Sequence, residues 1–275
     1  MAAPVQKRAL WAEGLLLLAI AAFCIFPFYW MVTTSLKTQV VALESPPVWT
    51  FTPTLANYWE VLFEDKVGVS LINSIIVAVC TTTLAVVLGT PAAYALARFE
   101  FRGKQDLWFW FITNRFVSPV VLAFPVFLLS RELGLRDTHL ALILMYLTFT
   151  LPIVIWICTD QFRSIPRELD EAALLEGASQ WRIFRSICLP LAMPGVAVSS
   201  ILSFIFSWNE LLFAYILAPK AAKTAPAMAI TFMEGYDVPY GKIMATSTLI
   251  VIPVLIFALI ASKHLVRGLT MGAVK

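Results

Sequence analysis

Two charged residues lie deep inside apolar segments of this 275-residue chain. Arg115 lies beside Asn114 in the third apolar segment, and Glu210 lies beside Asn209 in the fifth. A charge at bilayer depth costs about 2.5–3.5 kcal/mol on insertion scales, so such residues usually face a polar interior and serve a function. We expect Arg115 and Glu210 to face the same interior, as a pair or joined through water and a solute. The alternative is structural, with both side chains capping kinked backbone.

The chain shows no arrangement of residues typical of an enzyme or a metal site. No H-E-x-x-H or C-x-x-C spacing occurs, and the Gly-Lys pairs 103–104 and 241–242 lack the upstream glycine of a phosphate-binding loop. We therefore expect no catalytic residue, no metal and no cofactor in this chain. The isolated cysteines predict small buried hydrophobes, and the isolated histidines predict interfacial residues: Cys24, Cys80, Cys158, Cys188, His139 and His264.

The composition indicates an integral membrane protein. Hydrophobic residues make up 60% of the chain and charged residues only 13%, against about 25% charged in a soluble domain. A helix needs about 20 apolar residues to cross a bilayer. The sequence predicts an all-α, kinked bundle in a single domain, 1–275, with six spans: 10–36, 69–97, 107–130, 138–162, 187–218 and 243–263.

The basic residues between the spans predict the orientation. One set of loops and termini carries 12 Lys and Arg, and the opposite set carries 7. The more basic side is cytoplasmic by the positive-inside rule. We expect both termini and the loop 163–186 on that side, in a multi-pass protein of a bacterial or archaeal cytoplasmic membrane.

The loop 163–186 is expected to hold two short helices. Pro166 suits the first turn of the first helix, Gly177 suits its end, and Ser179 can cap the second. Each helix has a small apolar face: Leu169, Ala172 and Ala173 on the first, and Trp181, Phe184 and Cys188 on the second. These faces would cover either the ends of this chain's own helices or a separate soluble subunit.

The same loop carries a long, gapped motif. Glu171-Ala172-Ala173, Gly177 and the run Ile187-x-Leu189-Pro190 resemble the EAA loop of ABC importer permeases. The segments 206–214 (FSWNELLFA) and 267–275 (RGLTMGAVK) are similar to carbohydrate-type permeases, a group that includes the shorter permease of maltose systems. The segment 137–152 (DTHLALILMYLTFTLP) resembles the sugar and sugar-alcohol branch.

This resemblance implies a type I importer fold and a set of partners. These are a second homologous permease, a dimer of ATP-binding subunits that hold ATP and Mg²⁺, an extracytoplasmic solute-binding protein and the lipid bilayer, without nucleic acid. It also implies two ATPase contacts. The coupling loop would use Glu171, Ala172, Ala173, Gly177, Trp181 and Phe184, and the C-terminal contact Gly268, Thr270, Gly272 and Lys275.

A sugar substrate would present hydroxyl groups to polar side chains and apolar ring faces to aromatic ones. The expected pathway is Asn114, Arg115, Tyr146, Phe149, Trp208, Asn209, Glu210 and Phe213. In such heterodimers, most sugar contacts can come from the other permease. Arg115 leaves an anionic sugar derivative, sulfonated or phosphorylated, as an alternative. A secondary transporter would show inverted repeats, which we do not find, and would leave the loop motif unexplained.

Overall fold

The computed structural model describes residues 5–235 and 237–271, and these residues form helices and loops without a β-strand. This confirms the predicted all-α class. The chain divides into two units, residues 1–68 with 229–251 and residues 69–228 with 252–275. The prediction of a single domain stays a prediction.

Five helical segments among the described residues are long and apolar enough to cross a membrane. They lie in α1 (Val5–Ser35), α4 (Val67–Arg98), α7 (His139–Ser164), α10 (Leu189–Trp208) with the turns before it, and α13 (Tyr240–Met271). Each contains a proline in its interior, as the sequence predicts. Such prolines are tolerated in a membrane when other groups satisfy the freed backbone.

The segment expected to form the third span, 107–130, is not one helix. It contains α5 (Lys104–Thr113), a 3₁₀ turn η2 (Asn114–Phe116) and α6 (Pro119–Glu132). Pro119 has no amide hydrogen and disfavours helical geometry in the residue before it, and Ser118 is extended at φ −63°, ψ 127°. Since α5 and α6 are each shorter than the roughly 20 residues of a full span, six spans remain a prediction.

The segment expected to form the fifth span, 187–218, is also interrupted. After α10 the chain leaves the helix and resumes as α11 (Leu212–Leu217), before α12 (Ala225–Thr231). The break falls on the polar residues Asn209 and Glu210, which the sequence places inside an apolar run expected to form one span.

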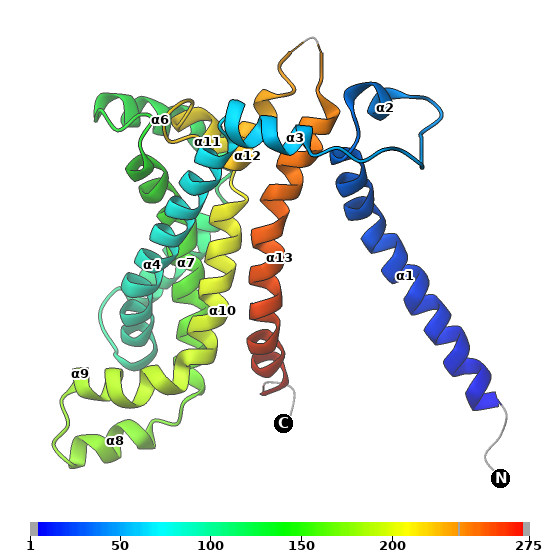
Figure 1. Ribbon diagram of the computed structural model, residues 1–275. Helices are drawn as coiled ribbons and strands as arrows, with labels where there is room; N and C mark the ends of the chain where they lie inside the picture. The colour runs from blue at the N-terminus through cyan, green and yellow to red at the C-terminus, as the bar shows by residue number, and fades with distance from the viewer. Residues whose placement is uncertain (1–4, 236, 272–275) are drawn as a thin grey trace. The chain divides into compact units, whose positions relative to one another are not determined.

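In the second unit, α7 packs along α10 and lies against α4. Two glycines allow this approach. A Cβ on Gly89 of α4 would lie 2.8 Å from Cγ1 of Val154, and a Cβ on Gly195 of α10 would lie 2.8 Å from Cβ of Gln161. Figure 1 shows α8 and α9 beyond one end of these helices and α6 and α11 at the other.

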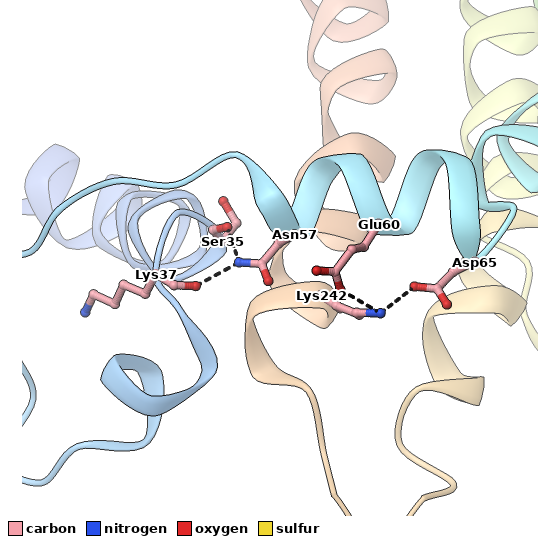
Figure 2. A network of polar contacts seen from close by, with 6 residues as sticks. All are labelled: Ser35, Lys37, Asn57, Glu60, Asp65 and Lys242. Atoms are coloured by element: carbon pink, nitrogen blue, oxygen red, sulfur yellow. Dashed lines mark hydrogen bonds and ion pairs between the residues drawn. The ribbon is translucent and has the colours of Figure 1, made fainter.

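In the first unit, three short elements connect α1 to α4: α2 (Gln39–Leu43), α3 (Ala56–Trp59) and the π-helical turn η1 (Glu60–Glu64). Nζ of Lys242, in α13, lies 3.0 Å from a carboxylate oxygen of Glu60 and 3.0 Å from one of Asp65 (Figure 2). Asn57 donates two hydrogen bonds of 2.8 Å to backbone carbonyls at the C-terminal end of α1. These contacts hold the connecting segment to α1 and α13.

Candidate functional site

The predicted coupling loop is a two-helix elbow. It consists of α8 (Glu168–Leu175), α9 (Gln180–Ile183) and a π-helical turn η3 (Phe184–Cys188) that leads into α10. Gly177 ends α8 at φ +82°, a conformation that glycine adopts without steric cost. The amides of Gly177 and Ala178 donate to the carbonyls of Leu174 and Ala173, which is the Schellman pattern of a helix end. Ser179 caps α9 by accepting from the amide of Arg182.

The inner face of the elbow is part of the core of the second unit. Ala173, Ile183, Phe184 and Cys188 are buried. They share one cluster with residues near the ends of the membrane helices: Tyr94 and Ala97 of α4, and Phe162 with the adjoining Ile165 of α7. The ring of Tyr94 lies 5.0 Å from that of Phe184 and 5.4 Å from that of Phe162, measured between centroids. The elbow is therefore fixed on the helix ends.

The outer face of the elbow is exposed and mixes apolar with charged side chains. Leu175 is 91% exposed and Trp181 63% exposed, and Glu171, Ala172 and Gly177 also lie on the surface. Three acidic residues occupy the first turn of α8, where the helix dipole favours negative charge. This face combines apolar side chains with a carboxylate and suits a partner that offers both a hydrophobic cleft and a basic residue.

Three details differ from the sequence-based expectation. Pro166 precedes α8 by two residues instead of lying in its first turn, because Arg167 is the N-cap. Of the three residues expected on one apolar face, only Ala173 is buried, whereas Leu169 and Ala172 are exposed. Trp181 contacts the ring of Phe184 at 5.2 Å but otherwise points outward. Sequence periodicity identified the helix but could not assign which side meets the core.

The polar residues after Trp208 complete the two helix ends at the break between α10 and α11. The side-chain amide of Asn209 donates to the carbonyl of Ile205 at 2.9 Å. The carboxylate of Glu210 accepts from the amides of Phe213 at 3.0 Å and Ala214 at 3.1 Å. Glu210 therefore caps α11, which is the structural alternative raised by the sequence.

Asn114 also satisfies backbone. Pro152 has no amide hydrogen, so the carbonyl of Thr148, one turn earlier in α7, loses its usual helical partner. The side-chain amide of Asn114 donates to that carbonyl at 3.0 Å and ties η2 to α7. The side chain of Arg115 lies outside the described residues, so its pairing with Glu210 stays a prediction.

The aromatic residues expected to stack on a solute are mostly used in packing. Tyr146 is fully buried, and Trp208 and Phe213 are 1% and 2% exposed. Trp208 stacks on Phe204 with ring centroids 5.7 Å apart, and only Phe149 of the expected set is partly accessible. Direct stacking on the three buried rings would require repacking, and a role for them in binding stays a prediction.

A cavity of about 530 Å³ lies beside η2. Its lining comes from α5, η2 and α7: Phe111, Ile112, Phe116, Pro152 and Trp156. Trp156 is 47% exposed and lies one helical turn after Pro152, and Phe116 is largely exposed. The sequence does not single out these two rings. The signal was present in the aromatic residues flanking the Asn114–Arg115 break, but apolar segments contain many such residues.

The loop after α11 is held by a group of polar contacts. Asp137 has φ +61°, and its carboxylate accepts from the amides of residues 220–222 at 2.9–3.3 Å. Asn73 donates to the carbonyls of Ala221 and Lys223. Partial burial raises the pKa of Asp137, but the backbone hydrogen bonds outweigh it and hold the pKa below its ordinary value.

The expected C-terminal contact is described only in part. Gly268 and Thr270 belong to the part of α13 in which only the backbone is described. Gly272 and Lys275 lie outside the described residues altogether. A contact of this segment with an ATPase stays a prediction.

Residues 85–271 match a protein family that is described as "Binding-protein-dependent transport system inner membrane component". This range includes the whole elbow and the break between α10 and α11. The chain belongs to this family. It is accordingly a permease component and a multi-pass protein of the inner membrane.

Relatives match this permease over nearly its full length. A trehalose transport system permease protein of Mycobacterium tuberculosis is 40% identical over 93% of this chain and 94% of its own. A trehalose/maltose transport system permease protein of Thermococcus litoralis is 36% identical over 98% of both. In fold, the permease is similar to a chain of a bacterial ABC transporter involved in the import of the acidic polysaccharide alginate, with a TM-score of 0.77. The two chains are 22% identical, and the match covers 96% of this chain and 98% of the other.

Proposed function

We propose that this chain is the permease subunit of an ATP-driven importer that moves a sugar or sugar alcohol across the cytoplasmic membrane. The observation that carries the proposal is the elbow 163–186, which has one face buried in the helix ends and the other exposed for a partner. The relatives that transport trehalose and maltose support a neutral sugar as substrate. They do not favour the anionic derivative that Arg115 suggests.

In the proposed mechanism, ATP and Mg²⁺ bind to separate subunits. The exposed face of the elbow seats in a cleft on an ATP-binding subunit, with Glu171 opposite a basic residue. Closure of the two ATP-binding subunits then turns the elbow, and its packed inner face passes that motion to the membrane helices. A second permease completes the pathway, a solute-binding protein delivers the sugar from outside, and both termini lie in the cytoplasm.

The solute would meet aromatic surfaces in the pathway. The cavity beside η2 exposes the ring of Trp156 and the ring of Phe116, which offer flat apolar faces to the C–H faces of a sugar. Because Asn114, Asn209 and Glu210 are engaged with backbone, these open rings are the better candidates for direct contact.

The test is transport by the purified complex. The tagged chain is isolated with its partners, reconstituted in liposomes with the binding protein, and supplied with labelled trehalose or maltose. We expect uptake that requires ATP on the side of the membrane where the ATP-binding subunits lie. We also expect Trp156→Ala to reduce this uptake. Uptake driven by a proton or sodium gradient without ATP would identify a secondary transporter and refute the proposal.

A further inference from the structure

The elbow is joined to its unit in two ways. Its backbone continues into α7 at one end and α10 at the other, so any rotation of the elbow pulls these two helices directly. The helix α4 has no such covalent connection to the elbow, although its last turn lies in the same core cluster. Only side-chain contacts can make α4 move with the elbow.

One ion pair crosses this junction. Nε of Arg98, the last residue of α4, lies 2.7 Å from Oδ2 of Asp170 in the first turn of α8. The two side chains are only 5% and 14% exposed. Within the part of the chain whose side chains are described, no other ion pair joins α8 to a membrane-spanning helix.

Both partners make a second contact that fixes their orientation. Nη2 of Arg98 donates to the carbonyl of Ile165, directly after α7, at 3.0 Å. Oδ1 of Asp170 accepts from the thiol of Cys188, directly before α10, at 3.1 Å. The pair therefore lies where α4, α7, α8 and α10 meet. Apolar packing is non-directional, whereas a planar guanidinium that is ion-paired through Nε and hydrogen-bonded through Nη2 specifies one geometry.

We propose that Arg98 and Asp170 are positioning residues that fasten α4 to the coupling elbow, so that α4 moves with it during transport. The proposal rests on the proposed function, because it assigns the pair to the coupling step of the same elbow. An exposed pair could not serve in this way, since water and salt weaken it and its side chains stay mobile. A buried pair keeps its geometry as long as both charges are present.

Two variants test the pair without leaving an isolated buried charge. Arg98→Lys keeps the charge but has a single nitrogen, which cannot hold the carboxylate of Asp170 and the carbonyl of Ile165 in the same geometry. The double variant Arg98→Met, Asp170→Leu replaces both charges with apolar groups of similar size, a change that buried pairs often tolerate. The control is Lys104→Met, Glu100→Leu, which removes an ion pair of 2.8 Å whose carboxylate is exposed.

The measurements are solute uptake per ATP hydrolysed in liposomes, and hydrogen exchange of the amides in α8 and the last turn of α4. Loss of the charge-assisted hydrogen bond from Nη2 of Arg98 to the carbonyl of Ile165 corresponds to about a tenfold change in a local equilibrium. We expect both Arg98 variants to assemble, to exchange about tenfold faster at this junction and to take up less solute per ATP, with the KM for solute unchanged. The control should match the wild type.

The proposal is overturned if either Arg98 variant assembles and couples uptake to ATP as the wild type does. It is also overturned if both variants fail to assemble, since the pair would then be required for folding and not for coupling. Failure of the proposed function would look different, because the wild-type complex itself would show no ATP-dependent sugar uptake.

Discussion

Substitution of Gly177 by alanine isolates the contribution of the turn that closes α8. Gly177 has φ +82°, and a Cβ at this position would meet no atom within 4 Å, so the cost of alanine is conformational and not steric. An L-residue in the left-handed region costs about 1–2 kcal/mol. A loss of that size lowers the ratio of closed to open turn by about 5–30-fold.

Two measurements follow this change. Hydrogen exchange of the amides of Gly177 and Ala178, which donate to carbonyls of α8, should accelerate by the same factor in Gly177→Ala. Uptake per ATP by the reconstituted complex should fall, because a frayed elbow transmits less rotation. Gly177→Asn should lie close to the wild type in both assays, since asparagine tolerates the left-handed region better than most residues.

Gly134 supplies a matched control. It has φ +66°, a Cβ there would also meet no atom within 4 Å, and it lies in the loop after α6, away from the elbow. Gly134→Ala should therefore carry the same conformational cost without a change in coupling. The reasoning is refuted if Gly177→Ala accelerates exchange but leaves uptake per ATP intact, or if the Gly134 variant uncouples transport equally.

Three further changes test other parts of the structure. Asp137→Asn should weaken the hold on the loop 220–222 by about 1–3 kcal/mol, as expected for hydrogen bonds to a charged acceptor. Because the pKa of Asp137 is lowered in the folded state, the carboxylate stabilises the loop at pH values above its unfolded-state pKa. This stabilisation is lost as the pH falls through the folded-state pKa, and protection of the amides of residues 220–222 measured against pH can follow the loss. Gly195→Leu should destabilise the contact with Gln161 by about 1–3 kcal/mol in thermal unfolding, since its Cβ would lie 2.8 Å away. Lys242→Met should speed proteolysis of the segment before α4 by weakening two ion pairs worth about 0–1 kcal/mol each.

Each of these changes has a control or a contrary outcome. Gly14→Ala adds a Cβ that meets nothing within 4 Å, so its unfolding temperature should not fall, and an equal fall for Gly14 and Gly195 would contradict the packing argument. Protection of the amides of residues 220–222, relative to an unfolded peptide at the same pH, that does not change between pH 7 and the acid range would exclude the Asp137 carboxylate as the group that holds the loop. Unchanged cleavage in Lys242→Met would show that packing alone holds that segment.

The sequence predicted the elbow well because its signals are local. Gly177 ends α8 and Ser179 caps α9 through hydrogen bonds to residues within one turn of the chain. The position of each residue in the sequence is therefore enough to predict where these helices end and begin. The apolar spans are predictable for the same reason, as a run of about 20 apolar residues suffices to indicate a membrane helix. Family membership then follows from a motif whose spacing depends on these local elements.

The breaks within the third and fifth expected spans could not be predicted with the same certainty. Hydropathy reports whether a residue belongs in a membrane and not whether its helix is continuous. Pro119 indicates a possible break in an apolar run, but α4, α7 and α10 contain prolines without a comparable interruption. Whether a proline ends a helix depends on what satisfies the freed backbone groups, and that depends on other helices.

Long-range polar contacts were beyond the sequence for the same reason. Arg98 and Asp170 are far apart along the chain, and each alone resembles an ordinary charged residue at a helix end. Asn114 is a related case. The sequence places it in the solute pathway because it adjoins Arg115 and could meet a sugar hydroxyl, and it leaves a structural role open; in the fold, Asn114 donates to the carbonyl that Pro152 leaves unpaired. Only the position of Thr148 reveals this backbone contact, and a pathway role for Asn114 stays a prediction.

This distinction changes where solute recognition should be sought. An intramembrane polar group that already binds backbone can turn to a substrate only by leaving another group unsatisfied, so recognition through Asn114, Asn209 or Glu210 would carry that cost. The exposed part of an aromatic ring can meet a solute without giving up a hydrogen bond. Neutral sugars gain from such faces through their C–H surfaces without requiring a charge. The open rings of Trp156 and Phe116 can therefore contact a solute at a smaller structural cost than the polar residues that first draw attention in the sequence.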